Sequence, residues 1–222
     1  MQKIKVEYLY ENSVARIILD DGKGNVLDNI MMNELIPLLQ SFKLNNNLKL
    51  ITFEGAGKNF SYGASVEEHT KDKAAQMLES FHKIFLTLIE LSIPTLAKIS
   101  GQSLGGGFEL CLVCNFIFAD KTAKVGQPEI LLGVFAPPAS IMLPLKIGNA
   151  KSDELLITGK IISAEEAKQI GLKEVDVYIK GPGVGRDAAL RAVRAANLKL
   201  RLIADITPIP HDGVKPRKKR RV

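Results

Sequence analysis

The sequence predicts an α/β fold in which pairs of short strands are followed by helices. Segments rich in β-branched and aromatic residues, the composition typical of strands, alternate with segments whose apolar residues recur at helical spacing. Glycine-bearing loops separate strand-like from helix-like segments at residues 55–65 and 100–107. The 222 residues are 46% hydrophobic, which is typical of a globular protein with one large domain or two small ones.

The first elements are a predicted β-hairpin followed by a capped helix. Residues 4–10 and 14–19 are rich in β-branched and aromatic side chains and are separated by a short polar turn. Asp28 is placed to cap the next helix, because its side-chain oxygen can accept a hydrogen bond from the first helical turn. Pro37 lies inside this helix and is expected to kink it or to end it early. The next strand is predicted at residues 48–53.

The middle of the chain is predicted to contain a long helix over residues 66–91. Its apolar stripe, which is expected to face the core, consists of Met77, Phe81, Ile84, Phe85 and Leu88. Residues 94–99 form the strand that leads to the second glycine loop. Further on, residues 163–166 read Ser-Ala-Glu-Glu, a capping box in which the serine caps a helix and Glu166 reaches back. That helix is expected to end at Gly171, which suits the C′ position.

The second glycine loop and the residues after it have the composition of a reactive site. Three glycines, residues 105–107, follow the strand at 94–99 and open a helix-like segment at 108–114. Such a turn allows a ligand to approach the backbone closely, and it leaves the first N–H groups of the helix free to bind an oxyanion. Glu109 and Glu129 flank the turn in sequence. A carbonyl polarised by N–H donors between two carboxylates suits the addition or removal of water or protons beside that carbonyl.

Three motifs together closely resemble the enoyl-CoA hydratase/isomerase (crotonase) family. They are Phe-Ser-Tyr-Gly-Ala-Ser at 60–65, Gly-Gly-Gly-Phe-Glu-Leu at 105–110 and Gly-Gln-Pro-Glu at 126–129, in the family's order and spacing. The resemblance covers about residues 6–172 and implies a spiral of strand-strand-helix units. A crotonase normally continues with several more helices, which close the acyl pocket and build a trimer or hexamer. Those helices are expected to be missing here, while a homo-oligomer remains the implied assembly.

The resemblance also implies a site for an acyl-CoA substrate. The backbone N–H groups of Ala64 and Gly106 would form an oxyanion hole for the thioester carbonyl. Glu109 and Glu129 match the two catalytic glutamates, of which one takes a proton from water while the other orients that water and delivers a proton to carbon. The presence of both favours a hydratase over the isomerases and hydrolases of the family. The implied substrate contacts are Val26, Leu27, Tyr62, Gly63, Gly105 and Phe135. No metal or redox cofactor is implied, and coenzyme A arrives with the substrate.

Two departures from the common family pattern bear on the acyl group. Ser65 stands where the family usually has Asp, and residues 132–141 replace a glycine-rich run. Tyr62 and Phe135 would add aromatic surface to the pocket. Together these features resemble the branch that hydrates cyclic dienoyl-CoA thioesters, such as cyclohexa-1,5-diene-1-carbonyl-CoA from the anaerobic degradation of aromatic compounds.

The amino terminus and the cysteines restrict the location and the cofactor class. No signal peptide is visible, and the most apolar window, residues 130–145, contains three prolines and is too short to span a bilayer. A cytoplasmic protein without a membrane partner is therefore predicted. Cys111 and Cys114 have the spacing of a redox or zinc pair. Because they lie in an apolar helix-like run and no second pair follows, we interpret them as small core residues.

The charge distribution divides the chain into two predicted domains. Residues 1–172 contain 17 Lys and Arg against 19 Asp and Glu, a net charge of −2. Residues 173–222 contain 13 against 5, a net charge of +8, which implies a different partner. The first range is the predicted acyl-CoA domain. The second is predicted to be a short basic segment with a strand and turn at 175–183, a helix at 185–197 and a strand at 199–203.

The basic segment resembles the C-terminal half of the small-subunit ribosomal protein eleven family. The matching motifs are Ile-Lys-Gly-Pro-Gly at 179–183, Gly-Arg-Asp-Ala-Ala-Leu-Arg-Ala at 185–192 and Thr-Pro-Ile-Pro-His at 207–211, whereas Asp212 and Val214 depart from the family pattern. The resemblance implies binding to ribosomal RNA through phosphate contacts. The candidates for these contacts are Arg186, Arg191, Arg194, Arg217, Lys218, Lys219, Arg220 and Arg221.

The apparent join near residue 172 leaves three interpretations open. The chain is an acyl-CoA hydratase with a basic appendage, an RNA-binding ribosomal component with an N-terminal passenger, or a chimera with neither function. The first is favoured because the hydratase-like part is about three quarters of the chain and keeps every catalytic motif.

Overall fold

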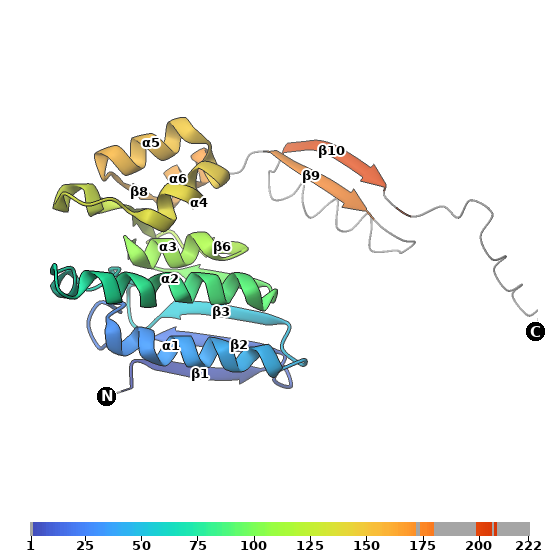
Figure 1. The fold of residues 1–222 in the computed structure, drawn as a ribbon. Coiled ribbons are helices and arrows are strands. Elements are labelled where there is room, and N and C mark those ends of the chain that lie inside the picture. Colours follow the sequence, from blue (N-terminus) through green and yellow to red (C-terminus); the bar gives the residue numbers. More distant parts are fainter. Residues whose placement is uncertain (1, 172–173, 180–198, 206, 208–222) are drawn as a thin grey trace, which may run out of the picture. The chain divides into compact units, whose positions relative to one another are not determined.

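A computed structural model of the chain describes residues 2–171, 174–179, 199–205 and 207 (Figure 1). The chain divides into two compact units, Met1–Gly171 and Leu172–Val222. The described part of the second unit is a pair of parallel strands, β9 (Glu174–Ile179) and β10 (Lys199–Asp205). Both coincide with strands that the sequence predicts, whereas the predicted helix at 185–197 lies outside the described residues.

Five strands form the larger sheet of the first unit. They are β1 (Ile4–Leu9), β2 (Val14–Leu19), β3 (Leu50–Gly55), β4 (Thr95–Ile99) and β6 (Phe116–Ala119), in this spatial order. β1 and β2 are antiparallel, which confirms the predicted hairpin, and the other neighbours are parallel. Ile17 and Phe53 are register partners in the centre of this sheet, and both side chains are fully buried in the core.

A second sheet contains three short strands. They are β5 (Gln102–Leu104), β7 (Lys124–Gly126) and β8 (Ile161–Ser163), in the order β5-β7-β8. β5 follows β4 directly and β7 follows β6, so the chain passes twice from the larger sheet to the smaller one. This repetition of strand, strand and helix confirms the predicted α/β class. It also places the ends of β5 and β7 beside each other, where the glycine turn begins.

Helix α1 (Asn29–Ser41) packs against the next long helix and covers the larger sheet (Figure 1). Asp28 caps it as predicted, since its Oδ1 accepts a hydrogen bond from the Met31 N–H at 3.0 Å. The prediction that Pro37 ends the helix early is wrong, because α1 continues for another turn. Buried apolar side chains on both sides of Pro37 offset the lost backbone hydrogen bond. These side chains are Met31, Met32, Leu35, Ile36 and Leu39.

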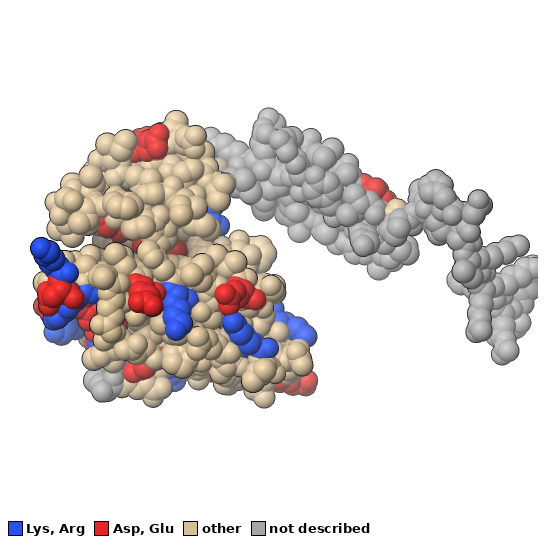
Figure 2. All heavy atoms as spheres, viewed as in Figure 1, with Lys and Arg blue, Asp and Glu red and all other residues tan. Residues whose placement is uncertain are grey.

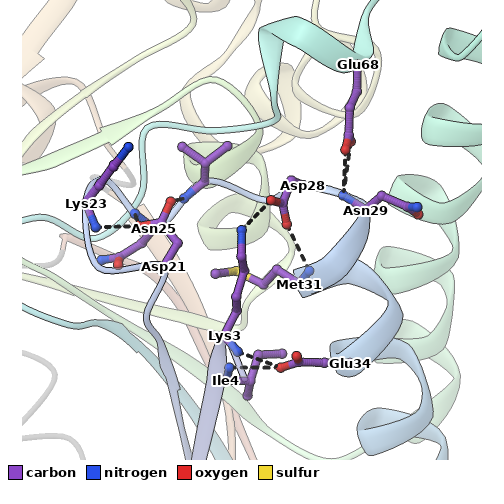
Figure 3. Close-up of polar contacts among 11 residues, drawn as sticks. Lys3, Ile4, Asp21, Lys23, Asn25, Asp28, Asn29, Met31, Glu34 and Glu68 are labelled. Carbon is purple, nitrogen blue, oxygen red and sulfur yellow. Dashed lines mark hydrogen bonds and ion pairs between the residues drawn. The ribbon is translucent and has the colours of Figure 1, made fainter. Parts of the chain in front are cut away.

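Helix α2 (Ala74–Leu91) begins later than the predicted start at residue 66. Val66–Glu68 form a short 3₁₀ helix, η2, instead. The Glu68 carboxylate accepts the Asn29 N–H at the start of α1, with its two oxygens at 3.0 and 3.2 Å, so this hydrogen bond joins η2 to the start of α1 (Figure 3). The predicted apolar stripe of α2 is confirmed, because all five of its side chains are buried.

The remaining helices follow the second glycine loop. They are α3 (Gly106–Val113), α4 (Pro137–Ile147), α5 (Asn149–Thr158) and α6 (Ala164–Ile170). The Ser163 hydroxyl caps α6 as predicted, accepting the Glu166 N–H at 3.2 Å. The rest of the predicted capping box is wrong, because the Glu166 carboxylate pairs with Lys160 at 2.6 Å. Gly171 is the C-cap residue with φ −70°, not the C′ residue of a left-handed turn.

The two cysteines are buried in and beside α3. Both are free thiols, and each sulfur lies 3.3 Å from a carbonyl oxygen one helical turn earlier. Burial raises the pKa of both thiols, that of Cys114 to about 12, so that the neutral form is favoured. The interpretation of Cys111 and Cys114 as core residues is confirmed.

The most apolar window of the sequence, residues 130–145, is divided between two elements. It begins in the 3₁₀ helix η3 (Pro128–Leu132) and ends in α4. Among the described residues, no helix is both long enough and apolar enough to cross a membrane.

Candidate active site

The glycine turn between β5 and α3 forms the base of the candidate site. Gly105 adopts φ +51°, a conformation that suits glycine, and its N–H donates to the Gly126 carbonyl at the end of β7 at 3.0 Å. Helix α3 begins at the next residue, Gly106. As the first helical residue, Gly106 has an N–H group without an acceptor in the helix. The turn therefore presents one backbone donor beside the joined ends of two strands.

A second turn, at Gly63 and Ala64, presents another donor beside the first. Gly63 has φ +96°, and its carbonyl accepts the Leu27 N–H at 2.9 Å. The C=O and N–H of a trans peptide point in opposite directions, so this bond directs the Ala64 N–H away from Leu27. A Cβ atom placed on Gly106 would lie 3.1 Å from the Ala64 nitrogen, and one placed on Gly63 would lie 3.0 Å from the Gly106 nitrogen. Only glycine allows the two turns to approach this closely.

Neither of these two N–H groups is engaged elsewhere in the described part of the chain. Within residues 2–171, neither Ala64 nor Gly106 donates its N–H to a loop, turn or side-chain acceptor within 3.5 Å. The two groups that the sequence predicts as an oxyanion hole are therefore close together and available to a ligand.

Glu109 lies one turn into α3, and its side chain is buried. Its Oε1 accepts the N–H of Ala139, in the first turn of α4, at 2.9 Å. Burial raises the pKa of Glu109 from its ordinary value of 4.5 to about 8; the Ala139 N–H opposes this rise and the charge of Glu129 adds to it. Glu109 is therefore largely protonated at neutral pH.

Glu129 approaches the glycine turn from η3. A Cβ atom placed on Gly105 would lie 2.8 Å from Glu129 Oε1, so the carboxylate rests directly over the turn. The Gln127 amide satisfies its hydrogen bonds when its nitrogen faces the Glu129 carboxylate. In this orientation the nitrogen donates to both Glu129 oxygens, each at 3.0 Å. Burial raises the pKa of Glu129, against the opposing effects of its own backbone N–H and of the positive charge of His69. Two carboxyl groups with raised pKa values thus belong to the candidate site, Glu129 over the glycine turn and Glu109 one turn into the helix that follows it.

The loop before α1 is fixed by hydrogen bonds from its own backbone (Figure 3). The Asp21 carboxylate accepts the N–H groups of Lys23, Asn25 and Val26 at 2.7–2.9 Å. Val26 is half-buried, whereas the Leu27 side chain belongs to the core. Any contact between Leu27 and a ligand must therefore come from its backbone.

The two predicted aromatic residues lie on exposed parts of the surface. The Tyr62 side chain is 49% exposed and its ring packs on Gly24, where an added Cβ would lie 2.5 Å from the ring. Phe135 is 70% exposed between η3 and α4. In the described part of the chain, no three His, Cys, Asp or Glu side chains cluster closely enough to hold a metal ion.

Comparisons with known proteins identify the family. The sequence profile of enoyl-CoA hydratase/isomerase matches residues 10–177. This chain belongs to the enoyl-CoA hydratase/isomerase family. A Thauera aromatica protein named cyclohexa-1,5-dienecarbonyl-CoA hydratase is 39% identical over 188 residues, which cover 85% of this chain and 71% of that protein. A Rhizobium meliloti protein named "Probable enoyl-CoA hydratase" is 37% identical over 150 residues, 67% of this chain and 58% of that protein.

A solved structure of the family supports the same fold. The crystal structure of an enoyl-CoA hydratase from Bacillus anthracis superposes with a TM-score of 0.73 at 31% identity, covering 77% of this chain and 68% of that one. The predicted crotonase resemblance and fold are therefore confirmed. The chain spans 58–71% of the length of the two curated relatives.

A second profile, that of ribosomal protein S11, matches residues 158–221. This match confirms the predicted resemblance of the C-terminal segment. The candidate phosphate-binding residues all lie outside the described residues. They are Arg186, Arg191, Arg194, Arg217, Lys218, Lys219, Arg220 and Arg221.

Three polar residues in or near the enoyl-CoA hydratase/isomerase motifs were not predicted as site residues from the sequence. Gln127 lies within the Gly-Gln-Pro-Glu motif, and its amide contacts Glu129. His69 follows the Ala64 turn, where its Nδ1 lies 2.7 Å from the Ser65 carbonyl. Ser61, inside the first motif, is fully buried. Motif membership was the only available signal for Gln127 and Ser61, and nothing local marks His69.

The raised pKa of Glu109 predicts that the stability of the chain decreases as pH rises. Between pH 4.5 and about 8 the folded state holds a proton that the unfolded state releases, so the free energy of unfolding falls through this window. Glu109→Gln has no such proton. From about pH 5 to about pH 9 its stability relative to wild type should therefore rise, by about 4 kcal/mol at most. Urea unfolding across this range measures the difference, and parallel pH profiles would contradict the prediction.

Proposed function

We propose that this chain adds water to the double bond of an enoyl-CoA thioester. One observation supports the proposal most directly: the Ala64 and Gly106 N–H groups lie close together, Glu129 lies over the turn before Gly106, Glu109 lies one turn into the same helix, and both carboxyl groups have raised pKa values. Two converging N–H donors suit an oxygen that gains negative charge. Two nearby carboxyl groups suit the transfer of a proton to one carbon while water attacks another. Hydration of a carbon–carbon double bond conjugated to a thioester requires both.

In the proposed reaction the thioester oxygen binds between the two backbone donors. As the oxygen of water bonds to the β-carbon, electron density moves through the double bond toward the carbonyl. The Ala64 and Gly106 N–H groups stabilise the resulting enolate-like charge, and one such donor typically lowers a barrier by about 3–4 kcal/mol. The thioester itself is the electron sink, so the step needs no metal or redox cofactor, and coenzyme A enters as part of the substrate.

Glu109 and Glu129 move the two protons of the proposed reaction. An ionised carboxylate takes one proton from the attacking water, and a carboxylic acid delivers one to the α-carbon, so the atoms of one water molecule are added in total. Like charges in a shared buried site disfavour double ionisation, which keeps one group protonated while the other is ionised. Each proton transfer typically contributes about 10²–10⁴-fold to the rate.

A cyclic dienoyl-CoA is the substrate class that we favour. The Thauera aromatica relative is named for hydration of cyclohexa-1,5-dienecarbonyl-CoA. In this chain, Ser65 follows the oxyanion turn, and the aromatic side chains of Tyr62 and Phe135 are exposed on the loops of the site, where they are available to cover a flat ring. Val26 and the backbone of Leu27 would contact the coenzyme A portion, with Gly63 and Gly105 allowing its thioester to approach.

The purified chain should therefore hydrate a cyclic dienoyl-CoA and, more slowly, crotonyl-CoA. Loss of the enoyl-thioester absorbance measures both reactions. Turnover that disappears in Glu109→Gln but persists in Glu79→Gln, an exposed glutamate of α2, would support the assigned site. A folded chain without turnover on either thioester would contradict the proposed function.

Self-association through α4 and its neighbours is also part of the proposal. Figure 2 shows charged side chains of both signs over α1 and α2, in keeping with ion pairs such as Lys43–Glu90, but few charges around α4 and α5. Large apolar side chains are exposed in this region, and such surfaces typically mark interfaces. They are Ile130, Leu131, Leu132, Val134, Ile141, Leu145 and Ile157. We propose that further copies of the chain cover them.

The ribosomal protein S11 match supports RNA binding as a second candidate function of residues 173–222. Deleting these residues is expected to remove RNA affinity, because they contain the net charge of +8. Fluorescence anisotropy with a ribosomal RNA fragment at two salt concentrations measures this. An unchanged affinity and salt dependence in the truncated chain would reject the assignment.

A further inference from the structure

Ser61 joins two loops of the site through a single buried hydroxyl group. The residue lies between β3 and η2 and is fully buried. Its Oγ donates to the Asn25 carbonyl at 2.7 Å and accepts the Gly63 N–H at 3.0 Å. The first contact holds the loop that leads to Leu27, and the second holds the turn that presents Ala64.

The backbone of Ser61 also contacts the segment that leads to the second donor. Its N–H donates to the Gln102 carbonyl at 3.1 Å, and its own carbonyl accepts the Leu104 N–H at 3.0 Å. A Cβ atom placed on Gly107 would lie 2.8 Å from Ser61 Oγ, so the first turn of α3 packs directly on this hydroxyl. Ser61 is thus in contact with three segments that converge on the site.

The two hydroxyl contacts fix the orientation of the peptide group that contains the Ala64 N–H. Gly63 has φ +96° and no side chain whose packing could maintain this conformation. The hydrogen bond from its N–H to Ser61 Oγ restrains one side of the residue. The Leu27 bond to Gly63 O holds the other side. Because Asn25 lies two residues before Leu27, the same hydroxyl also restrains the loop that supplies this second bond.

We propose that Ser61 is a positioning residue that aims the Ala64 N–H at the thioester oxygen and thereby sets the strength of the oxyanion hole. The inference rests on the proposed function and deepens it. Ser61 touches neither the substrate nor the reacting atoms in this role; it acts through Gly63. Small misalignments of a preorganised donor weaken the charged transition state more than the bound ground state. The loss of this hydroxyl therefore affects kcat more than KM.

Ser103 provides a matched control. It is the bridge partner of Ser61 in the adjacent segment and is equally buried, but its hydroxyl contacts only the Cys111 sulfur, at 3.5 Å, among the described residues. Ser61→Ala and Ser103→Ala remove the same atom from neighbouring positions. Ser61→Cys retains a weak donor and acceptor at the site, and it tests rescue if the alanine variant folds poorly.

The experiment compares the three variants in the full chain by three readouts. These are kcat and KM for enoyl-CoA hydration, the long-wavelength absorption shift of bound cinnamoyl-CoA, and hydrogen exchange of the Gly63 amide. For Ser61→Ala we expect kcat to fall about tenfold with KM within about threefold, a smaller absorption shift, and faster exchange at Gly63. Ser61→Cys should lie between wild type and Ser61→Ala, and Ser103→Ala should match wild type in all three readouts.

The outcomes separate this inference from the proposed function. Wild-type kcat and absorption shift in Ser61→Ala, or equal losses in Ser61→Ala and Ser103→Ala, would overturn the positioning role. If wild type hydrates no enoyl-CoA, the proposed function fails and the role of Ser61 toward the thioester fails with it, so that exchange at Gly63 tests only the hydrogen-bond tether. Faster exchange in Ser61→Ala than in Ser103→Ala then supports the tether, and equal exchange overturns it.

Discussion

Replacing Glu109 with glutamine is expected to lower kcat for enoyl-CoA hydration by about 10²–10⁴-fold while the chain stays folded. Glutamine has nearly the same shape, and its carbonyl oxygen can still accept the Ala139 N–H that Glu109 accepts at 2.9 Å. It cannot gain or lose the proton that the reaction requires. Steady-state kinetics with the cyclic and the linear thioester, together with thermal unfolding, measures both parts of the prediction.

Glu129→Gln tests the other half of the pair, and a similar loss is expected. Its amide cannot serve as base or acid, although it can still contact the Gln127 amide that lies 3.0 Å from both Glu129 oxygens. Glu79→Gln controls for the loss of one negative charge, since Glu79 is exposed on α2. Full turnover in both Glu109→Gln and Glu129→Gln would show that the assigned carboxyl groups are not the catalytic pair.

Features that depend on local sequence were predictable. The stripe of α2 follows from apolar residues at helical spacing, and all of them are buried. Asp28 as the cap of α1 and Ser163 as the cap of α6 follow from side chains that bond to backbone groups three residues away. The turn at Gly105 follows from three consecutive glycines after a strand. In each case the interacting groups lie within one turn of each other.

Features that depend on distant contacts were not predictable in the same way. β5, β7 and β8 have three residues each, which is too short for an alternating pattern to be recognised. Helix α2 starts eight residues later than predicted, and Glu68, in the segment before it, bonds to Asn29, 39 residues earlier in the chain. The bond from Ser61 to Asn25 spans 36 residues. The family motifs predicted the candidate site, but only the fold shows which polar groups surround its residues.

Gly106→Ala is expected to reduce kcat by at least about 10²–10³-fold, because the added methyl group occupies the space between the two backbone donors. The new Cβ would lie 3.1 Å from the Ala64 nitrogen, where the thioester oxygen is expected to bind. It would also lie 2.7 Å from Cζ of Phe81, so a destabilisation of about 1–3 kcal/mol should accompany the loss of activity. Enoyl-CoA kinetics and urea unfolding measure the two effects separately.

A second substitution distinguishes blocked donors from disturbed packing. Phe81→Leu replaces the ring that the new methyl group meets by a smaller side chain. The double variant Gly106→Ala with Phe81→Leu should therefore recover stability relative to Gly106→Ala. Activity should not recover, because the methyl group still lies beside the Ala64 N–H. Phe81→Leu alone should keep most of its turnover. If the double variant regained activity together with stability, disturbed packing against Phe81 would explain the loss of activity in Gly106→Ala. The thioester oxygen would then have to bind elsewhere than between Ala64 and Gly106.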